Sequence, residues 1–169
     1  MIIWINGAYG VGKTTIANLL KDEFHPSFIF DPEIVGNGIR DNYPEELFCE
    51  TFEQYDIWLE TCYKLLKDIH ACYNGTTIVP MTLLFDKSYQ WIIEKLKEDG
   101  IDVRYIFLDA NYDTLYKRMV ETGREEKDSW CVDHIDVCLE RQKSDDKAIH
   151  INTINKTPKE IVKEIKSKI

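Results

Sequence analysis

The chain has 169 residues, of which 44% are hydrophobic and 30% charged, and its formal net charge at pH 7 is −9. This length predicts one domain over residues 1–169 with a core large enough to fold unaided, and the apolar fraction excludes a disordered chain. Because nucleic-acid backbones favour stripes of Lys and Arg, the acidic balance argues against nucleic acid as a partner.

The N-terminal residues do not resemble a secretory signal, since the apolar start spans only five residues before a glycine-rich segment. No stretch approaches the length of a transmembrane helix, so we expect no stable membrane insertion. The five cysteines are scattered without a C-x-x-C pair, which is typical of reduced thiols. Together these features predict a cytoplasmic protein.

A glycine-rich segment follows the first predicted strand, the apolar run 1–5. It fits the pattern G-x-x-x-x-G-K-[ST] and consists of Gly7, Ala8, Tyr9, Gly10, Val11, Gly12, Lys13 and Thr14. Apolar residues then follow helical spacing from Ile16 to Phe24, so a helix is expected to begin near Lys13. Strand, loop and helix in this order predict a phosphate-binding loop.

Each part of this loop has a chemical task. The glycines let backbone N–H groups turn inward and cradle phosphate oxygens. Lys13 can reach the β- and γ-phosphates, and the Thr14 hydroxyl can ligate Mg²⁺. The phosphates would lie at the positive end of the following helix. The loop therefore predicts a nucleotide ligand accompanied by Mg²⁺.

The second predicted strand, residues 28–30, stops at Asp31. Ligands of α/β sheets bind at the carboxyl ends of the strands, which places Asp31 near the γ-phosphate. There it can orient an acceptor hydroxyl and take its proton. Asp31 also suits the N-cap of a helix that begins at Pro32, and the two roles are compatible. Arg40 on that helix is a candidate acceptor contact, with a structural ion pair as the alternative.

A long helix is predicted over residues 46–73, because apolar residues recur in steps of four and three. The stripe favours packing on the core, and a dimer seam is the alternative. The expected oligomeric state is accordingly a monomer or a homodimer.

The third predicted strand, residues 76–79, leads to Thr82 without an acidic residue at its end. The acid that holds Mg²⁺ in many phosphate-loop proteins is thus missing there, and Thr82 is the candidate hydroxyl in its place. Tyr55, Trp58 and Met81 are candidates for the wall of an acceptor pocket, with core packing as the alternative reading.

The fourth strand is predicted over residues 103–108 and is followed by a helix over 112–121. Arg118 and Arg124 flank the end of this helix, and a polar stretch follows. A lid over residues 122–142 that carries arginines can close over ATP and neutralise the transferring phosphoryl group. Solvated surface charges are the alternative.

The remaining elements are a strand over residues 148–151 and a last helix, which a capping box of Thr157 and Glu160 is expected to start. Helical and strand patterns alternate along the chain. This alternation predicts an α/β protein with a mainly parallel sheet.

Four blocks of the sequence resemble the tunicamycin-resistance ATP-binding protein family, which is one of the small phosphate-loop kinases together with adenylate, shikimate and chloramphenicol kinases. The blocks are residues 1–14, 31–33, 79–82 and 129–130. The likeness extends over nearly the whole chain. It implies a three-layer phosphate-loop NTPase fold, with a five-stranded parallel sheet in the order 2-3-1-4-5, flanking helices and a short lid.

The resemblance also implies ATP and Mg²⁺ at residues 7–15, which adds Thr15 to the loop. It implies contacts to ATP from Arg118 and Arg124, and a contact to the adenine from the region of Asn155. The implied role is resistance to a nucleoside antibiotic, by phosphorylating or sequestering it.

Two functions follow from these observations. The leading hypothesis is an ATP-dependent kinase for a small molecule, in which Asp31 positions an acceptor hydroxyl while Lys13, Mg²⁺, Arg118 and Arg124 stabilise the transferring group. The alternative is an ATP-dependent binder that sequesters its ligand without transfer, which the missing acid after the third strand motivates. A GTPase is disfavoured, because residues 155–158 lack the aspartate of an N-K-x-D motif.

Overall fold

The computed structural model describes residues 1–123 and 129–169. The described residues contain a sheet of five strands that pair in parallel in the order β2-β3-β1-β4-β5. The strands are β1 (Ile2–Gly7), β2 (Ser27–Ile29), β3 (Thr76–Pro80), β4 (Val103–Asp109) and β5 (Ile149–Asn152). The predicted sheet order is confirmed, and each predicted strand limit lies within two residues of the observed one.

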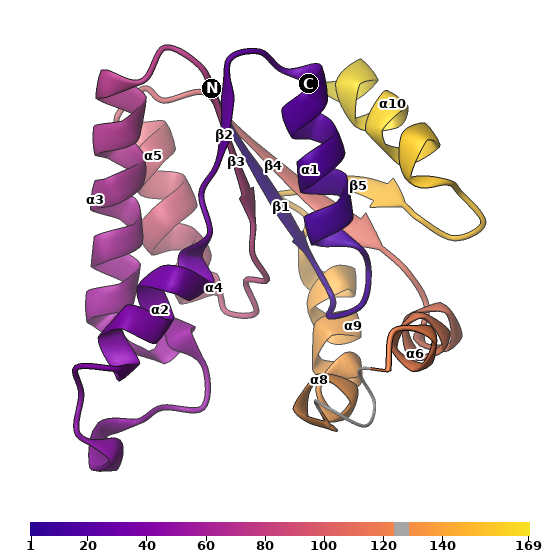
Figure 1. The fold of residues 1–169 in the computed structure, drawn as a ribbon, viewed down its shortest axis with the longest axis horizontal. Coiled ribbons are helices and arrows are strands. Elements are labelled where there is room, and N and C mark those ends of the chain that lie inside the picture. Colours follow the sequence, from indigo (N-terminus) through magenta and orange to yellow (C-terminus); the bar gives the residue numbers. More distant parts are fainter. Residues whose placement is uncertain (124–128) are drawn as a thin grey trace.

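Helices cover both faces of this sheet (Figure 1). The longer ones are α1 (Lys13–Glu23), α2 (Pro32–Arg40), α3 (Asp56–Cys72), α6 (Tyr112–Glu121), α9 (Ile135–Ser144) and α10 (Pro158–Lys168). The shorter ones are α4 (Asp86–Ser88), α5 (Lys95–Glu98) and α8 (Ser129–Asp133), with 3₁₀ turns at Glu45–Leu47 and Phe52–Gln54 and a π-helical stretch at Tyr89–Glu94. Helices α3 and α5 lie on one face, and α1 and α10 lie on the other (Figure 1).

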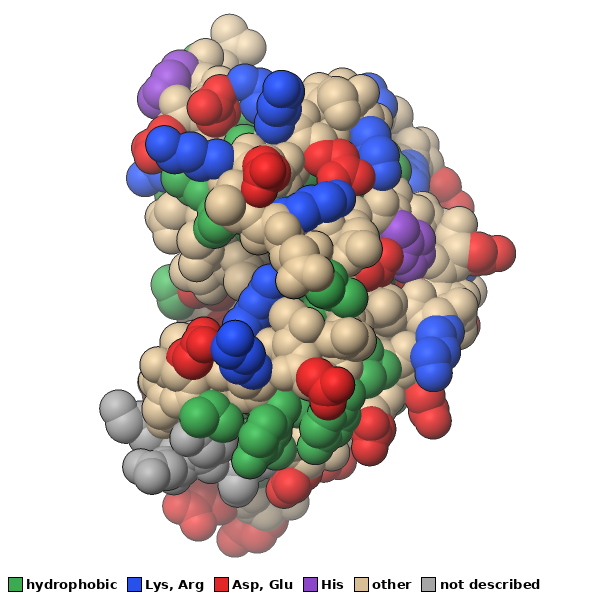
Figure 2. Space-filling view, turned by 90° about the vertical axis from the view of Figure 1, so that its right-hand side faces the viewer, with side chains coloured by type: hydrophobic (Ala, Val, Ile, Leu, Met, Phe, Trp, Pro, Cys, Tyr) green, Lys and Arg blue, Asp and Glu red, His purple; other side chains and the backbone are tan. Residues whose placement is uncertain are grey.

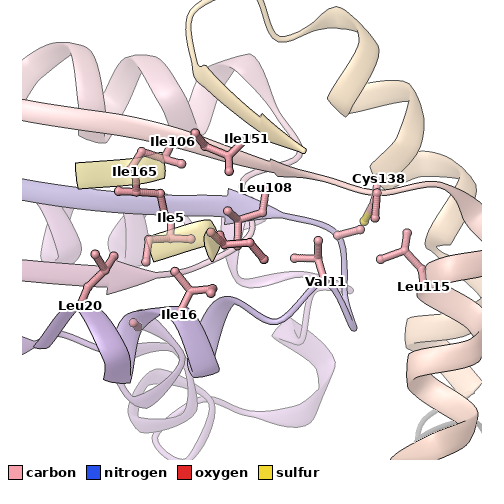
Figure 3. Close-up of a cluster of buried hydrophobic side chains, with 14 of the residues drawn as sticks. Ile5, Val11, Ile16, Leu20, Ile106, Leu108, Leu115, Cys138, Ile151 and Ile165 are labelled. Atoms are coloured by element: carbon pink, nitrogen blue, oxygen red, sulfur yellow. The ribbon is translucent and has the colours of Figure 1, made fainter. Parts of the chain in front are cut away.

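The apolar run of β1 is explained by burial on both faces. Ile3 and Ile5 belong to the core beneath α1 and α10, part of which Figure 3 shows. Ile2 and Trp4 belong to the second core, beneath α3 and α5. Because successive side chains of a strand point to opposite faces, a strand between two helical layers has to be apolar throughout.

The predicted helix over residues 46–73 is wrong in its first ten residues. Helix α3 begins at Asp56, and Tyr55 before it has an extended backbone. The side-chain Oε1 of Gln54 accepts a hydrogen bond from the Thr51 N–H at 3.0 Å, which closes a separate 3₁₀ turn. Local side-chain bonds to the backbone therefore override the apolar spacing. Within α3, the buried residues pack on the sheet as predicted; these are Trp58, Leu59, Cys62 and Leu66.

Thr157 caps α10 as predicted, since its side chain accepts from the Glu160 N–H. Among the described residues, no helix combines the length and the apolar character that a membrane crossing requires.

Basic and acidic side chains are mixed on the face shown in Figure 2, where Lys and Arg do not form a continuous stripe. A group of hydrophobic side chains lies beside the grey residues of that view. The neighbouring helix α6 exposes Tyr112, Tyr116 and Val120, one turn apart, each by more than 40%.

Candidate functional site

A cleft of about 1320 Å³ lies at the carboxyl ends of the strands, where α/β sheets bind ligands. Residues 9–14 of the phosphate loop (residues 7–14) and the first turns of α1 line one half, together with Arg118 from α6 and Lys156 and Ile161 from the C-terminal segment. We name this the nucleotide half. The other half is lined by residues 50–53 and 80–82 and by Asp31, Glu33, Asn37 and Arg40, and we name it the acceptor half.

Two glycines give the phosphate loop its shape. Gly7 has φ +140°, and a Cβ there would lie 2.8 Å from the carbonyl oxygen of Leu108. Gly12 has φ +106° and is the N-cap of α1. Both conformations are strained for other residues. Since α1 begins at Lys13, the predicted order of strand, loop and helix is confirmed.

Lys13 lies inside this loop. Its ammonium group donates to the carbonyl oxygens of Gly7 at 2.8 Å and Ala8 at 3.0 Å. Thr14 and Thr15 follow on the first turn of α1 and line the cleft. A hydroxyl completed by phosphate oxygens and water suits Mg²⁺, which retains several waters in nucleotide sites. The residues present therefore fit a nucleotide with its metal.

The floor of the loop is fixed by polar side chains from β1 and from the segment after β3. Asn6 Oδ1 accepts from the N–H groups of Gly7 at 2.7 Å and Leu83 at 2.9 Å. The Thr82 hydroxyl is buried and donates to the Gly7 carbonyl at 2.9 Å. The Thr82 proton is thus engaged in holding the loop, so the predicted contact of Thr82 with a ligand would use only its oxygen lone pairs.

Asp31 lies in the cleft, directly after β2, as the sequence predicts. Its carboxylate accepts from the Glu33 N–H at 2.9 Å and caps α2, with Pro32 in the first helical position. The capping role is confirmed, and the catalytic role stays a prediction. The cap fixes the direction of the carboxylate within the acceptor half of the cleft.

Arg118 joins three elements around the nucleotide half. Its guanidinium donates to the Val11 carbonyl at 3.0 Å, to the Thr153 hydroxyl at 3.2 Å and to the Thr153 carbonyl at 3.1 Å. Burial lowers the pKa of this guanidinium, which nevertheless remains charged at neutral pH. Arg118 thus holds α6 against the phosphate loop and the end of β5. Arg124 lies outside the described residues.

Asn155, the predicted adenine contact, does not line the cleft, and residues shortly after it do. Asn155 has a left-handed backbone with φ +57° and is not among the described residues that line the cleft. Lys156, Pro158 and Ile161 line it instead. The physical reason is the turn at Asn155, which leads the chain into α10 and brings the first turn of that helix to the nucleotide half.

Arg40 organises the acceptor half. It donates to the carbonyl oxygens of Cys49 at 2.7 Å and Glu50 at 3.3 Å, and its guanidinium lies 4.5 Å from the centre of the Phe52 ring. Neither partner is a carboxylate, so the ion pair considered as the alternative is replaced by bonds to backbone carbonyls. Arg40 lines the cleft, as predicted for an acceptor contact.

Of the three candidates for the acceptor wall, the two aromatic residues, Tyr55 and Trp58, are core residues. Tyr55 is 5% exposed and its hydroxyl accepts from the Cys49 N–H at 2.7 Å. Trp58 is fully buried and donates to the Pro32 carbonyl at 2.9 Å. Neither lies among the described cleft-lining residues, whereas Met81 does. We name residues 48–55 the acceptor segment. The Tyr55 side chain does not reach the cleft wall, because its hydroxyl is hydrogen-bonded within this segment.

Comparison with known proteins identifies the family. A family model described as an AAA domain matches residues 3–150. The chain belongs to the AAA domain family.

A shikimate kinase of Bacillus anthracis is similar to this AAA domain protein, with 29% identity over 99% of this chain and 97% of the relative. Two solved structures share its fold. The tunicamycin resistance protein of Deinococcus radiodurans has a TM-score of 0.80 at 22% identity, over 99% of this chain and 94% of that one. The APS kinase of Mycobacterium tuberculosis has a TM-score of 0.70 at 15% identity, over 98% and 95%. The fold is that of the small phosphate-loop kinases.

Sequence reasoning missed a buried acidic residue of the cleft in this AAA domain. Glu53 is 4% exposed, lines the cleft, and accepts from the N–H groups of Leu84 at 2.9 Å and Phe85 at 3.3 Å. Burial raises the pKa of this carboxyl, and the hydrogen bonds only partly offset the effect. Glu53 falls within the region predicted as continuous helix, where a single Glu gives no signal of burial.

A row of side chains also crosses from the phosphate loop to the acceptor segment. The ring of Trp130, on α8, meets the Tyr9 ring edge-on at 5.2 Å and stacks on His134 at 3.8 Å. His134 Nε2 lies 3.1 Å from a carboxylate oxygen of Glu50. Trp130 lines the cleft, so α8 contributes to its wall.

Proposed function

We propose that this protein is an ATP-dependent kinase that transfers the γ-phosphoryl group to a hydroxyl of a small molecule. The observation that carries the proposal is the presence of Lys13, Thr14 and Asp31 in one cleft, with Asp31 in the acceptor half. The similarity to a shikimate kinase and to an APS kinase supports a phosphotransferase in general.

The proposed roles follow from the positions of the side chains. Backbone N–H groups of the phosphate loop and Lys13 hold the β- and γ-phosphates, and Thr14 offers its hydroxyl to Mg²⁺. The bound metal supplies charge neutralisation on the phosphates. Asp31 would accept a hydrogen bond from the acceptor hydroxyl and take its proton as the acceptor oxygen bonds to the γ-phosphorus and the bond from that phosphorus to the departing ADP oxygen breaks. Arg118 stabilises the nucleotide half.

We further propose that residues 1–169 act as one cytoplasmic domain, in which residues 122–142 form a lid whose Arg124 completes the charge stabilisation. For the acceptor, we propose a nucleoside antibiotic of the tunicamycin class. The likeness to the Deinococcus radiodurans protein supports this choice over shikimate.

The test is direct transfer of radiolabelled phosphate. The purified protein is incubated with γ-labelled ATP and Mg²⁺ in the presence of tunicamycin, uridine or shikimate, and the products are separated by chromatography. A labelled product with one acceptor, which disappears in Lys13→Ala, supports the proposal. ATP binding without a labelled product in any reaction contradicts it.

A second candidate, a binder that sequesters its ligand, is favoured by one observation: β3 ends at Pro80 and no acid follows before Asp86. Calorimetry with tunicamycin in the presence of a non-hydrolysable ATP analogue separates the two functions. Tight binding without turnover supports sequestration, and absent binding eliminates it.

A further inference from the structure

Glu53 is a buried acid in the cleft that has no ion-pair partner among the described residues. It is 4% exposed, yet no described Lys, Arg or His nitrogen lies within 4.0 Å of its oxygens. Its hydrogen bonds come from the backbone N–H groups of Leu84 and Phe85. A buried carboxylate without a cation is costly, and neutral donors compensate only part of that cost.

The position of Glu53 is informative because it lies at the carboxyl edge of β3. Its two backbone donors, Leu84 and Phe85, belong to the segment that follows this strand. Phosphate-loop NTPases place there the acid that assists the Thr or Ser of the loop in holding Mg²⁺. In this chain no acid directly follows β3. Glu53, which comes from the segment before α3, instead places its carboxylate against the residues that follow this strand.

The segment that holds Glu53 is also tied to the phosphate loop. The N–H of Leu83, the residue before Leu84, and the N–H of Gly7 both donate to Asn6 Oδ1. Lys13 and Thr14 line the same cleft as Glu53. A divalent cation beside Thr14 would therefore lie within the electrostatic reach of this carboxylate.

We propose that Glu53 is the acid that stabilises Mg²⁺ in the nucleotide complex, and that it acts through a metal-bound water. We assign a water-mediated contact because three hydrogen bonds from the backbone of Leu84 and Phe85 already occupy most of the lone-pair sites of the Glu53 carboxylate. This inference rests on the proposed binding of ATP with Mg²⁺. In this proposal the acid that stabilises the metal comes from the turn η2 (Phe52–Gln54), because no acid directly follows β3.

The test compares binding of AMP-PNP with and without metal in the wild type and in Glu53→Gln. Calorimetry in EDTA measures the metal-free nucleotide, and electron paramagnetic resonance of free Mn²⁺ measures the metal in the ternary complex. Gln keeps an oxygen that can accept from the backbone. We expect metal-free binding to be unchanged or slightly tighter, because a negative charge is removed, and Mn²⁺ to bind about tenfold more weakly.

The matched control is Glu46→Gln, which removes the same charge from an exposed residue outside the cleft lining. It should leave both affinities within twofold of the wild type. Equal weakening of both affinities in Glu53→Gln would show that Glu53 only braces the segment after β3, and unchanged Mn²⁺ affinity would also overturn the inference. If the wild type itself binds no AMP-PNP, the proposed function fails first, so the two failures are distinguishable.

Discussion

The two halves of the cleft are built in different ways. The nucleotide half depends mainly on eight consecutive residues, whose glycines, lysine and threonine stand in one loop between β1 and α1. The acceptor half is assembled from the start of α2, the acceptor segment, the residues after β3 and the wall provided by α8. Its contacts join residues far apart in the chain, such as Glu53 with Leu84 and Glu50 with His134. A site formed by consecutive residues can be predicted from a sequence motif, whereas contacts between distant segments, such as these, cannot.

The largest expected effect is on the contiguous half. Lys13→Ala removes the ammonium group that would contact the β- and γ-phosphates, so transfer should fall about 10³-fold. The fold should persist, because the Lys13 ammonium group donates to carbonyls of its own loop and does not join distant elements through them. Labelled-phosphate transfer and circular dichroism measure the two quantities. Retention of more than a tenth of the activity would contradict the assigned role.

Asp31→Asn separates the capping role of Asp31 from its proposed role as the base. Asn caps helices as well as Asp does, so the melting temperature should change little. Asn cannot take a proton from the acceptor, and kcat should fall about 10²-fold or more. Steady-state kinetics with thermal unfolding in parallel provides the check. A large loss of stability with kcat nearly intact would mean that Asp31 is a cap alone.

Arg40→Met tests the assembled half. The variant loses the bonds to the Cys49 and Glu50 carbonyls, which should lower the free energy of unfolding by about 1–3 kcal/mol. The KM for the acceptor should rise several-fold, because the acceptor segment is loosened, while nucleotide affinity stays the same. Urea unfolding and calorimetry measure these quantities. An equal loss of nucleotide affinity would show that the halves are not independent.

The smallest effect concerns the support of the nucleotide half at β5. Burial alone would lower the pKa of His150, but its hydrogen bonds to the Asp145 carbonyl and the Asp109 carboxylate outweigh burial and raise it. Protonated His150 therefore stabilises the fold fully below its unfolded pKa of about 6.5, and this contribution is lost as pH rises through the folded value.

His150→Gln should accordingly narrow its stability gap to the wild type as the pH is raised from 5.5 to 8.5, about one unit below and two units above the unfolded pKa. Urea unfolding at several pH values measures the gap. A gap that is constant across this range would mean that His150 does not gain protons on folding.

The positions of Thr82 and Tyr55 show where sequence-based prediction of the site ends. Thr82 follows β3 as expected, but its hydroxyl donates a hydrogen bond to the carbonyl of Gly7, which is 75 residues away in the chain. Tyr55 shares an apolar periodicity with α3, but it lies before that helix. Its side chain does not form part of the cleft wall, and its hydroxyl accepts a hydrogen bond from the Cys49 N–H. Both outcomes depend on partners that approach only when the chain folds.

The sequence by itself determined the phosphate loop, the capped start of α2 at Asp31 and the parallel arrangement of the sheet. These features depend on local chemistry: the backbone freedom of glycine, a side chain that satisfies nearby N–H groups, and apolar runs that must be buried on both faces. Only the tertiary structure decided that Arg40 binds carbonyls of the acceptor segment and that Glu53 is buried at the edge of β3. Burial and hydrogen-bond partners of these charged side chains are set by segments distant in the chain, so their roles arise from packing and not from the residues beside them.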